Sequence, residues 1–80
     1  MDDADVVRRI NELADEEHRL ERAHAGDPLT GDELARLRQV EVALDQCWDL
    51  LRQRRARREM GQDPDAASAR PATVVEEYEQ

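Results

Sequence analysis

The chain has 80 residues, which allows one small domain, and its last twenty residues differ in composition from the sixty before them. Forty per cent of the residues are charged and the net charge is −8, which argues against a free-standing nucleic-acid or anionic-membrane binder. The single cysteine, Cys47, excludes an intramolecular disulfide, and the lack of a long apolar run predicts a cytoplasmic protein.

A first amphipathic helix is predicted over residues 3–25. Its apolar side chains recur at steps of three and four residues and form one narrow stripe, made of Val6, Ile10, Leu13 and Leu20. Asp2 or Asp3 can cap its start, and Gly26 is a typical C-terminal stop.

A second helix is predicted over residues 31–60. Thr30 and Glu33 have the spacing of a capping box, in which a hydroxyl and a carboxylate each accept a hydrogen bond from a helix-terminal backbone N–H. Leu29 before this box and Leu34 after it have the spacing of a hydrophobic staple. Gly61 should end the helix.

Along the second helix, a heptad-like stripe predicts the face that meets the first helix. The stripe consists of Leu34, Leu37, Glu41, Leu44, Trp48 and Leu51. Val40 and Cys47 lie beside it, so the apolar face is wider than one partner helix can cover. We therefore expect a homodimer, with core and dimer contacts from Leu44, Cys47, Trp48 and Leu51.

The short connection makes the two helices antiparallel neighbours. The predicted fold class is all-α: residues 1–61 form an antiparallel, coiled-coil-like two-helix hairpin that dimerises into a four-helix bundle. In the expected register Leu20 lies near Leu34, and Val6 lies near Trp48. The Arg-rich end of the second helix should then extend beyond the start of the first by roughly 10 Å. Glu17 and Glu41 interrupt the stripe, either to select register or by reaching nearby arginines.

Residues 62–80 are predicted to be a flexible tail. Thr73 and Glu76 have the spacing of a second capping box, which indicates a short helix at 73–79 that docks through Val74, Val75 and Tyr78. Disorder is the alternative for so short and acidic a segment. The sequence leaves open whether the tail docks in cis, swaps between chains or stays loose.

Five arginines in seven residues form the densest charged feature, and all are candidates for docking a partner: Arg52, Arg54, Arg55, Arg57 and Arg58. They spread around the helix and lack the aromatic neighbours of a nucleic-acid-binding face. The interpretation we favour is structural, with these cations meeting the acidic residues of both termini: Asp2, Asp3, Asp5, Glu76, Glu77 and Glu79. Docking of an acidic protein and contact with RNA or DNA are the alternatives.

Glu21 and His24 have the Glu-x-x-His spacing of di-iron helical bundles, and Glu17 lies one turn earlier. Such a site needs further inward carboxylates, so exposed charge at a helix end is the favoured interpretation, and no metal or cofactor is expected. Cys47 has no histidine within reach in the predicted hairpin, and we expect a buried apolar role for it rather than catalysis. The chain is therefore predicted not to be an enzyme.

A longer signature runs from Leu44 to Glu59 with the sequence LDQCWDLLRQRRARRE, followed by Gly61 and by Asp63-Pro64. This segment, together with residues 16–20 and the C-terminal Val75, Glu76 and Tyr78, resembles a small actinobacterial domain-of-unknown-function family, number twenty-six thirty. The resemblance covers nearly the whole chain. It implies no activity, cofactor or partner.

The function expected from the sequence is a non-enzymatic protein-protein interaction module with regulatory character, acting on a cytoplasmic protein of unknown identity. A transcription-associated or nucleic-acid-linked regulator that uses the same arginines is the second hypothesis. A metal-binding, ferritin-like bundle with Glu17, Glu21 and His24 is the third.

Overall fold

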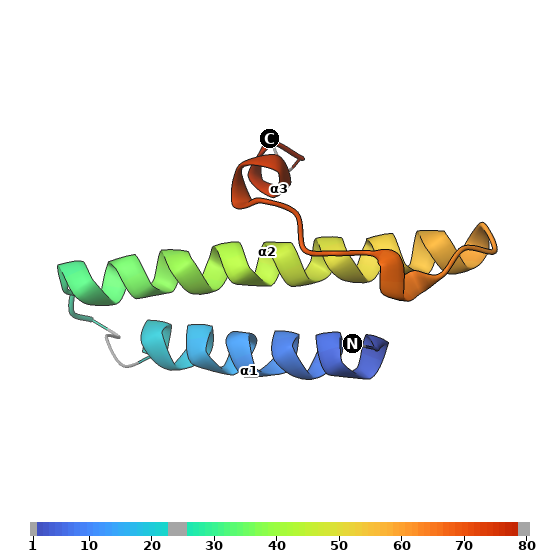
Figure 1. Cartoon of the computed structure of the whole chain (residues 1–80). Helices are drawn as coiled ribbons and strands as arrows, with labels where there is room; N and C mark the ends of the chain where they lie inside the picture. Colours follow the sequence, from blue (N-terminus) through green and yellow to red (C-terminus); the bar gives the residue numbers. More distant parts are fainter. Residues whose placement is uncertain (1, 23–25, 79–80) are drawn as a thin grey trace.

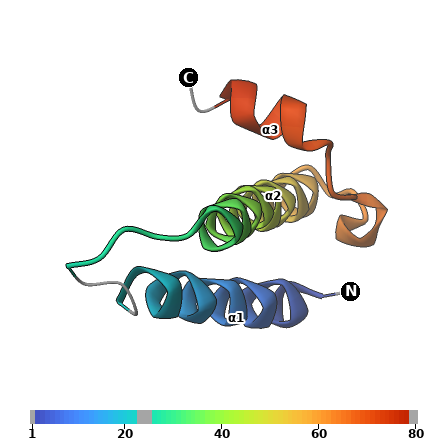
Figure 2. The same cartoon turned by 90° about the vertical axis from the view of Figure 1, so that its left-hand side faces the viewer.

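The computed structural model describes residues 2–22 and 26–78, with no side-chain description beyond Val75. Within these residues all regular structure is helical: α1 (Asp3–Arg22), α2 (Gly31–Glu59), the 3-10 helix η1 (Pro64–Ala66) and α3 (Ala72–Tyr78). α2 is the central element, with α1 antiparallel along one side and α3 on the other (Figures 1 and 2). The end of α2 extends beyond the start of α1 (Figure 1), as the predicted overhang requires.

The starts of both long helices are fixed by reciprocal side-chain caps. At α2 the backbone N–H of Glu33 donates to Thr30 Oγ1 (3.2 Å), and the N–H of Thr30 donates to Glu33 Oε1 (3.1 Å). At α1 the N–H of Asp5 donates to Asp2 Oδ1 (2.8 Å), and the N–H of Asp2 donates to Asp5 Oδ2 (3.1 Å). Each cap satisfies backbone donors that have no partner inside the helix.

The end of α2 is a glycine-terminated motif that turns the chain back. Gly61 has a φ of +74°, which an L side chain rarely adopts. The N–H of Gln62 donates to the carbonyl of Arg57 (2.7 Å), and the N–H of Gly61 donates to that of Arg58 (3.1 Å), as in a Schellman motif. The following residues therefore return along α2. The predicted end of α1, residues 23–25, lies outside the described residues.

The core lies between α1 and α2. From α1, Val6, Ile10 and Leu13 are buried, and Val6 and Ile10 form one cluster with Leu50 and Leu51 of α2. Leu44, Cys47 and Ala67 pack against this cluster. Ala67 belongs to the chain that follows α2, residues 62–78, which we call the C-terminal segment. This segment therefore also covers part of the core.

The prediction of which α2 side chains face α1 is wrong over part of the helix, because Val40 and Cys47 are covered in place of the predicted Glu41 and Trp48. Trp48 is 46 % exposed, and Leu34 and Glu41 are also exposed. The buried or partly buried side chains instead recur at steps of three and four residues through Leu37, Val40, Leu44, Cys47, Leu51 and Arg54. Val6 accordingly packs with Leu50 and Leu51 and not beside Trp48. Of the predicted core and dimer set, Leu51 is buried, Leu44 and Cys47 are half-buried, and Trp48 lies outside the core.

The C-terminal segment docks in cis on α2. After η1, the chain runs without helical structure to α3, which packs on α2. Val75 is 1 % exposed, whereas Val74 is 39 % exposed. α3 begins one residue before Thr73, so Thr73 cannot cap it, and the N–H groups of Val74 and Val75 donate to the carbonyl of Pro71. The side chains of Glu76, Glu77, Tyr78 and Glu79 lie outside the description.

Candidate functional site

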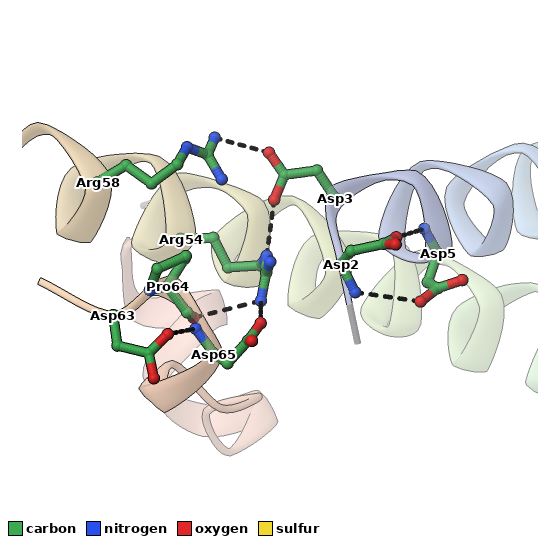
Figure 3. Close-up of polar contacts among 8 residues, drawn as sticks. All are labelled: Asp2, Asp3, Asp5, Arg54, Arg58, Asp63, Pro64 and Asp65. Atoms are coloured by element: carbon green, nitrogen blue, oxygen red, sulfur yellow. Dashed lines mark hydrogen bonds and ion pairs between the residues drawn. The ribbon is translucent and has the colours of Figure 1, made fainter.

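Arg54 joins three segments of the chain at the C-terminal end of α2. Its side chain is almost completely buried, with a residue exposure of 5 %. Arg54 Nε donates to Asp3 Oδ1 (2.6 Å), and Arg54 Nη1 donates to Asp65 Oδ1 (2.8 Å) and to the carbonyl of Pro64 (3.3 Å). Figure 3 shows the guanidinium between α1 and η1, with Arg58 on the other oxygen of Asp3. Arg54 therefore fixes the start of α1 and the returning chain on the same helix.

The electrostatics of this cluster follow from the contacts of Asp3. Hydrogen bonds from Arg58 and Arg54 lower the pKa of the Asp3 carboxyl from 3.8 to about 2. A hydrogen bond from Arg54 also lowers the pKa of Asp65. Both carboxylates are consequently charged at neutral pH and stabilise the buried guanidinium, which would otherwise be costly.

The five candidate docking arginines separate into two groups. Arg54 and Arg58 bind Asp3, which is the structural role favoured from the sequence for part of the cluster. Arg54 is not placed to dock a partner as the sequence predicted, because it is buried and its Nε and Nη1 groups donate to acceptors of the same chain. Arg52 and Arg55 are exposed, Arg57 is half-buried, and none of the three forms an ion pair within the described residues.

An ion pair between a buried aspartate and a partly exposed arginine holds the C-terminal segment, and sequence reasoning missed it. Asp49 of α2 is 3 % exposed. Both of its carboxylate oxygens accept from Arg70, with an Nε–Oδ2 distance of 2.9 Å. The contact with Arg70 holds the pKa of Asp49 below its usual value. The sequence shows only that Asp49 is next to Leu50 on α2, and a single aspartate on a helix does not indicate a buried ion pair.

Two glutamines flank this pair on α2. Gln46 Nε2 donates to the carbonyl of Arg70 (3.3 Å), and Gln53 Nε2 donates to the carbonyl of Ser68 (3.1 Å) and to Asp49 Oδ2 (2.9 Å). No sequence pattern singles out these amides, because their partners are backbone groups of a segment that has no regular structure.

The remaining candidate residues show no convergent chemistry. Burial raises the pKa of the Cys47 thiol, so the nucleophilic thiolate is disfavoured at neutral pH. Glu17 is half-buried and Glu21 is exposed, while His24 lies outside the described residues. Within the described residues, no group of three or more His, Cys, Asp or Glu side chains is placed to hold a metal ion. A shallow, open hollow on α1 is lined by Asp15, His18, Arg19 and Arg22.

None of the described helices has both the length and the apolar character that crossing a membrane requires.

A comparison with known protein families shows to which family the chain is related. The profile of the family described as "Protein of unknown function (DUF2630)" matches residues 2–80. The chain belongs to this family. An uncharacterized protein of Mycobacterium bovis and one of Mycobacterium tuberculosis are each 46 % identical to it over 77 residues, covering 95 % of this chain and 88 % of the relative. No solved structure matches the chain significantly.

Membership of the DUF2630 family confirms the resemblance carried by the segment from Leu44 to Glu59. That segment contains Asp49 and Arg54, the two buried charges that bind residues of the C-terminal segment to α2, and also the exposed Trp48. It therefore combines side chains that the fold uses internally with side chains that remain accessible to a partner.

Proposed function

We propose that this DUF2630 protein is a non-enzymatic, cytoplasmic interaction module that pairs through α2 into a four-helix homodimer. The observation that carries the proposal is Trp48, the only tryptophan, which lies 46 % exposed at the middle of the longest helix. Tryptophan and arginine are the residues most often found at the energetic centre of protein interfaces. Trp48 is not among the side chains that pack against the core cluster between α1 and α2.

The position of Trp48 suits a helix bundle. Trp48 follows Cys47 by one residue, so it projects from α2 about 100° away from the side that Cys47 presents to the core. In a four-sided bundle each helix has its two neighbours at about a right angle to one another. A second copy seated on Trp48 would therefore complete such a bundle, leaving α1 in place and the C-terminal segment on the remaining side.

Charge complementarity supports an antiparallel pairing of two α2 helices. A two-fold axis through Trp48 brings residues seven before it opposite residues seven after it. Glu41 of one copy then faces Arg55 of the second copy, and the same pair forms again on the other side of the axis. Glu41 and Arg55 are both exposed, and neither forms an ion pair within the described residues of one chain. An isologous interface of this kind closes at two subunits.

The Arg-rich end supplies a second contact surface for an acidic partner protein. Arg52 and Arg57 form no ion pair within the described residues, and Arg55, which faces Glu41 of the second copy in the proposed dimer, adds to the positive charge of this end in a chain whose net charge is −8. No observation favours the nucleic-acid or metal-binding hypotheses over this one. Two of the five arginines are committed to Asp3, which weakens the basic surface that nucleic acid would need.

Sedimentation equilibrium tests the dimer. The wild-type chain should show twice the monomer mass at tens of micromolar, and Trp48→Ala should show the monomer mass. Met60→Ala is the matched control, since Met60 is an exposed apolar side chain at the end of the same helix. Glu41→Arg should weaken the dimer, and Glu41→Arg with Arg55→Glu should restore it. A wild-type monomer at millimolar concentration would exclude the proposal.

The docking role is tested by partner capture from an actinobacterial lysate with and without nuclease. The bait is the wild-type chain, compared with a variant in which Arg52 and Arg57 are Ser and Arg55, which the proposed dimer uses, is kept. A nuclease-resistant protein that the variant fails to capture supports docking. Identical captures by both proteins would assign these arginines no role in partner binding.

A further inference from the structure

The side of α2 that carries the C-terminal segment has the features of a peptide-binding site. Gln46, Asp49 and Gln53 are spaced three and four residues apart, so they share one face of the helix. This face holds the nonhelical residues 67–71 by two backbone carbonyls, those of Ser68 and Arg70. Backbone acceptors two residues apart are how an extended ligand is gripped whatever its side chains are.

Two further contacts make the grip selective. The Arg70 guanidinium meets both oxygens of Asp49, a bidentate geometry that a lysine could not reproduce. Five residues later, Val75 is buried almost completely in the contact of α3 with α2. The ligand is therefore an extended segment with an arginine before a proline, followed by one helical turn with a buried valine.

All of these contacts lie within residues 68–75, and none depends on the covalent connection to α2. The connection itself passes through Gly61, whose positive φ directs the chain back over its own helix. A rotation at Gly61 would direct the same segment away from its own α2 together with η1, whose contacts with Arg54 would then form with Arg54 of the other molecule. The segment would then reach the identical face of another molecule.

We propose that the Gln46–Asp49–Gln53 face is a peptide-binding site and that residues 67–75 are its exchangeable ligand, donated in trans by a second copy of the chain. The site lies on a different face of α2 from Trp48 and is independent of the proposed dimer. In the wild-type chain the short connection keeps the effective concentration of the cis ligand at about the millimolar level, so cis docking dominates in dilute solution. Exchange takes over when the cis contact is broken and an intact ligand is present on another molecule.

Complementation between two full-length variants tests this exchange. Asp49→Ala destroys the site and keeps the ligand, whereas Arg70→Ala keeps the site and destroys the ligand. Both chains also carry Trp48→Ala, so that pairing through Trp48 contributes nothing. Only in the mixture does an intact Asp49 meet an intact Arg70, and they meet between molecules. We expect the mixture to contain about tenfold more dimer than either variant alone at the same total concentration, as measured by sedimentation velocity.

A matched control replaces Arg70→Ala by Arg52→Ala. It removes the same charge from an exposed arginine and leaves Arg70 of that chain on its own Asp49, so its mixture with Asp49→Ala should stay monomeric in dilute solution. Circular dichroism checks that each chain keeps its helices, and Asp49→Asn replaces Asp49→Ala if that variant unfolds. If mixtures of folded variants remain monomeric at about 10 micromolar and also at about 1 millimolar, the site is not exchangeable. This result would leave the Trp48 dimer untouched, since that dimer is tested in chains with Trp48 present.

Discussion

α2 is covered on two faces, by α1 and by the C-terminal segment, and the two contacts differ in chemistry. Against α1 the contact is mainly apolar, built from Val6, Ile10 and Leu13 on one side and Leu51 and its neighbours on the other. Against the C-terminal segment it is mainly polar, with the ion pair between the buried Asp49 and Arg70 and two amide-to-carbonyl hydrogen bonds. Apolar burial is non-directional, whereas hydrogen bonds require matched geometry. The first contact therefore supplies stability, and the second selects one segment in one register.

The largest effect is expected at the apolar contact. Leu13→Ala should lower the free energy of unfolding by about 2–5 kcal/mol, because it leaves a cavity where the fully buried leucine side chain was. A chain of this length is expected to have a total stability of roughly 4–12 kcal/mol, so the variant should be largely unfolded under mild denaturation. Urea denaturation followed by circular dichroism measures this. Val7→Ala, at an exposed position of the same helix, should change the stability by less than about 0.5 kcal/mol.

A smaller effect is expected where both contacts meet. Arg54→Ala removes the hydrogen bonds to Asp3, Asp65 and the Pro64 carbonyl, and should lower the Tm by about 5–10 °C. The loss is limited because Asp3 and Asp65 stay accessible to water once the guanidinium is gone. Arg52→Ala removes the same charge from an exposed position, and calorimetry should find its Tm close to that of the wild type. Equal Tm values for both variants would contradict the structural role of Arg54.

The helix caps should contribute less again. Thr30→Ala leaves the N–H of Glu33 without its side-chain acceptor and should cost about 1 kcal/mol in urea denaturation. Thr30→Ser keeps the hydroxyl and should recover most of the loss. Thr73→Ala, at a threonine that does not cap α3, is the control and should have little effect. A larger loss at Thr73 than at Thr30 would reverse the assignment of the caps.

The smallest effect is expected on acidification of the Asp3 cluster. The pKa of Asp3 is about 2 in the folded chain against 3.8 ordinarily, so its contribution to stability is complete above pH 3.8. That contribution is lost as the pH falls from 3.8 toward 2, because in this range the unfolded chain binds a proton at this carboxyl while the folded chain keeps it charged. Thermal melts across this range should show a weaker pH dependence for Asp3→Asn than for the wild type. Identical slopes would remove Asp3 from the acid response.

The local features of the fold could be predicted from the sequence. Thr30 and Glu33 identify the start of α2, and Gly61 identifies its end, because caps depend only on residues within one or two turns. The apolar spacing of Val6, Ile10 and Leu13 likewise identifies the buried face of α1, since no competing stripe exists on that helix.

The choice of contact face on α2 could not be predicted in the same way. Two neighbouring stripes, one through Val40 and Cys47 and one through Glu41 and Trp48, fit the same heptad spacing. Which stripe meets α1 depends on where the C-terminal segment lies, and that segment packs through Ala67 against the core. Long-range packing therefore decided what the local pattern left open.

The candidate site shows the same limit for charged residues. Five arginines in seven residues look equivalent in the sequence, yet Arg54 is buried while Arg52 and Arg55 are exposed. The difference arises because the chain returns at Gly61 and brings Asp65 and the Pro64 carbonyl to one of them. Asp49 was missed for a related reason, since its partner Arg70 is 21 residues away in an irregular segment.

Hydrogen exchange of the Val74 and Val75 amides is the most direct test of the contrast between the two faces. These amides donate to the Pro71 carbonyl. The contact of Asp49 with Arg70, just before α3, should keep α3 folded on α2. We expect them to be protected in the wild type and to exchange freely in Asp49→Ala, while amides at the centres of α1 and α2 stay protected in both. Free exchange of Val74 and Val75 in the wild type, or unchanged protection in Asp49→Ala, would contradict a C-terminal segment held by Asp49.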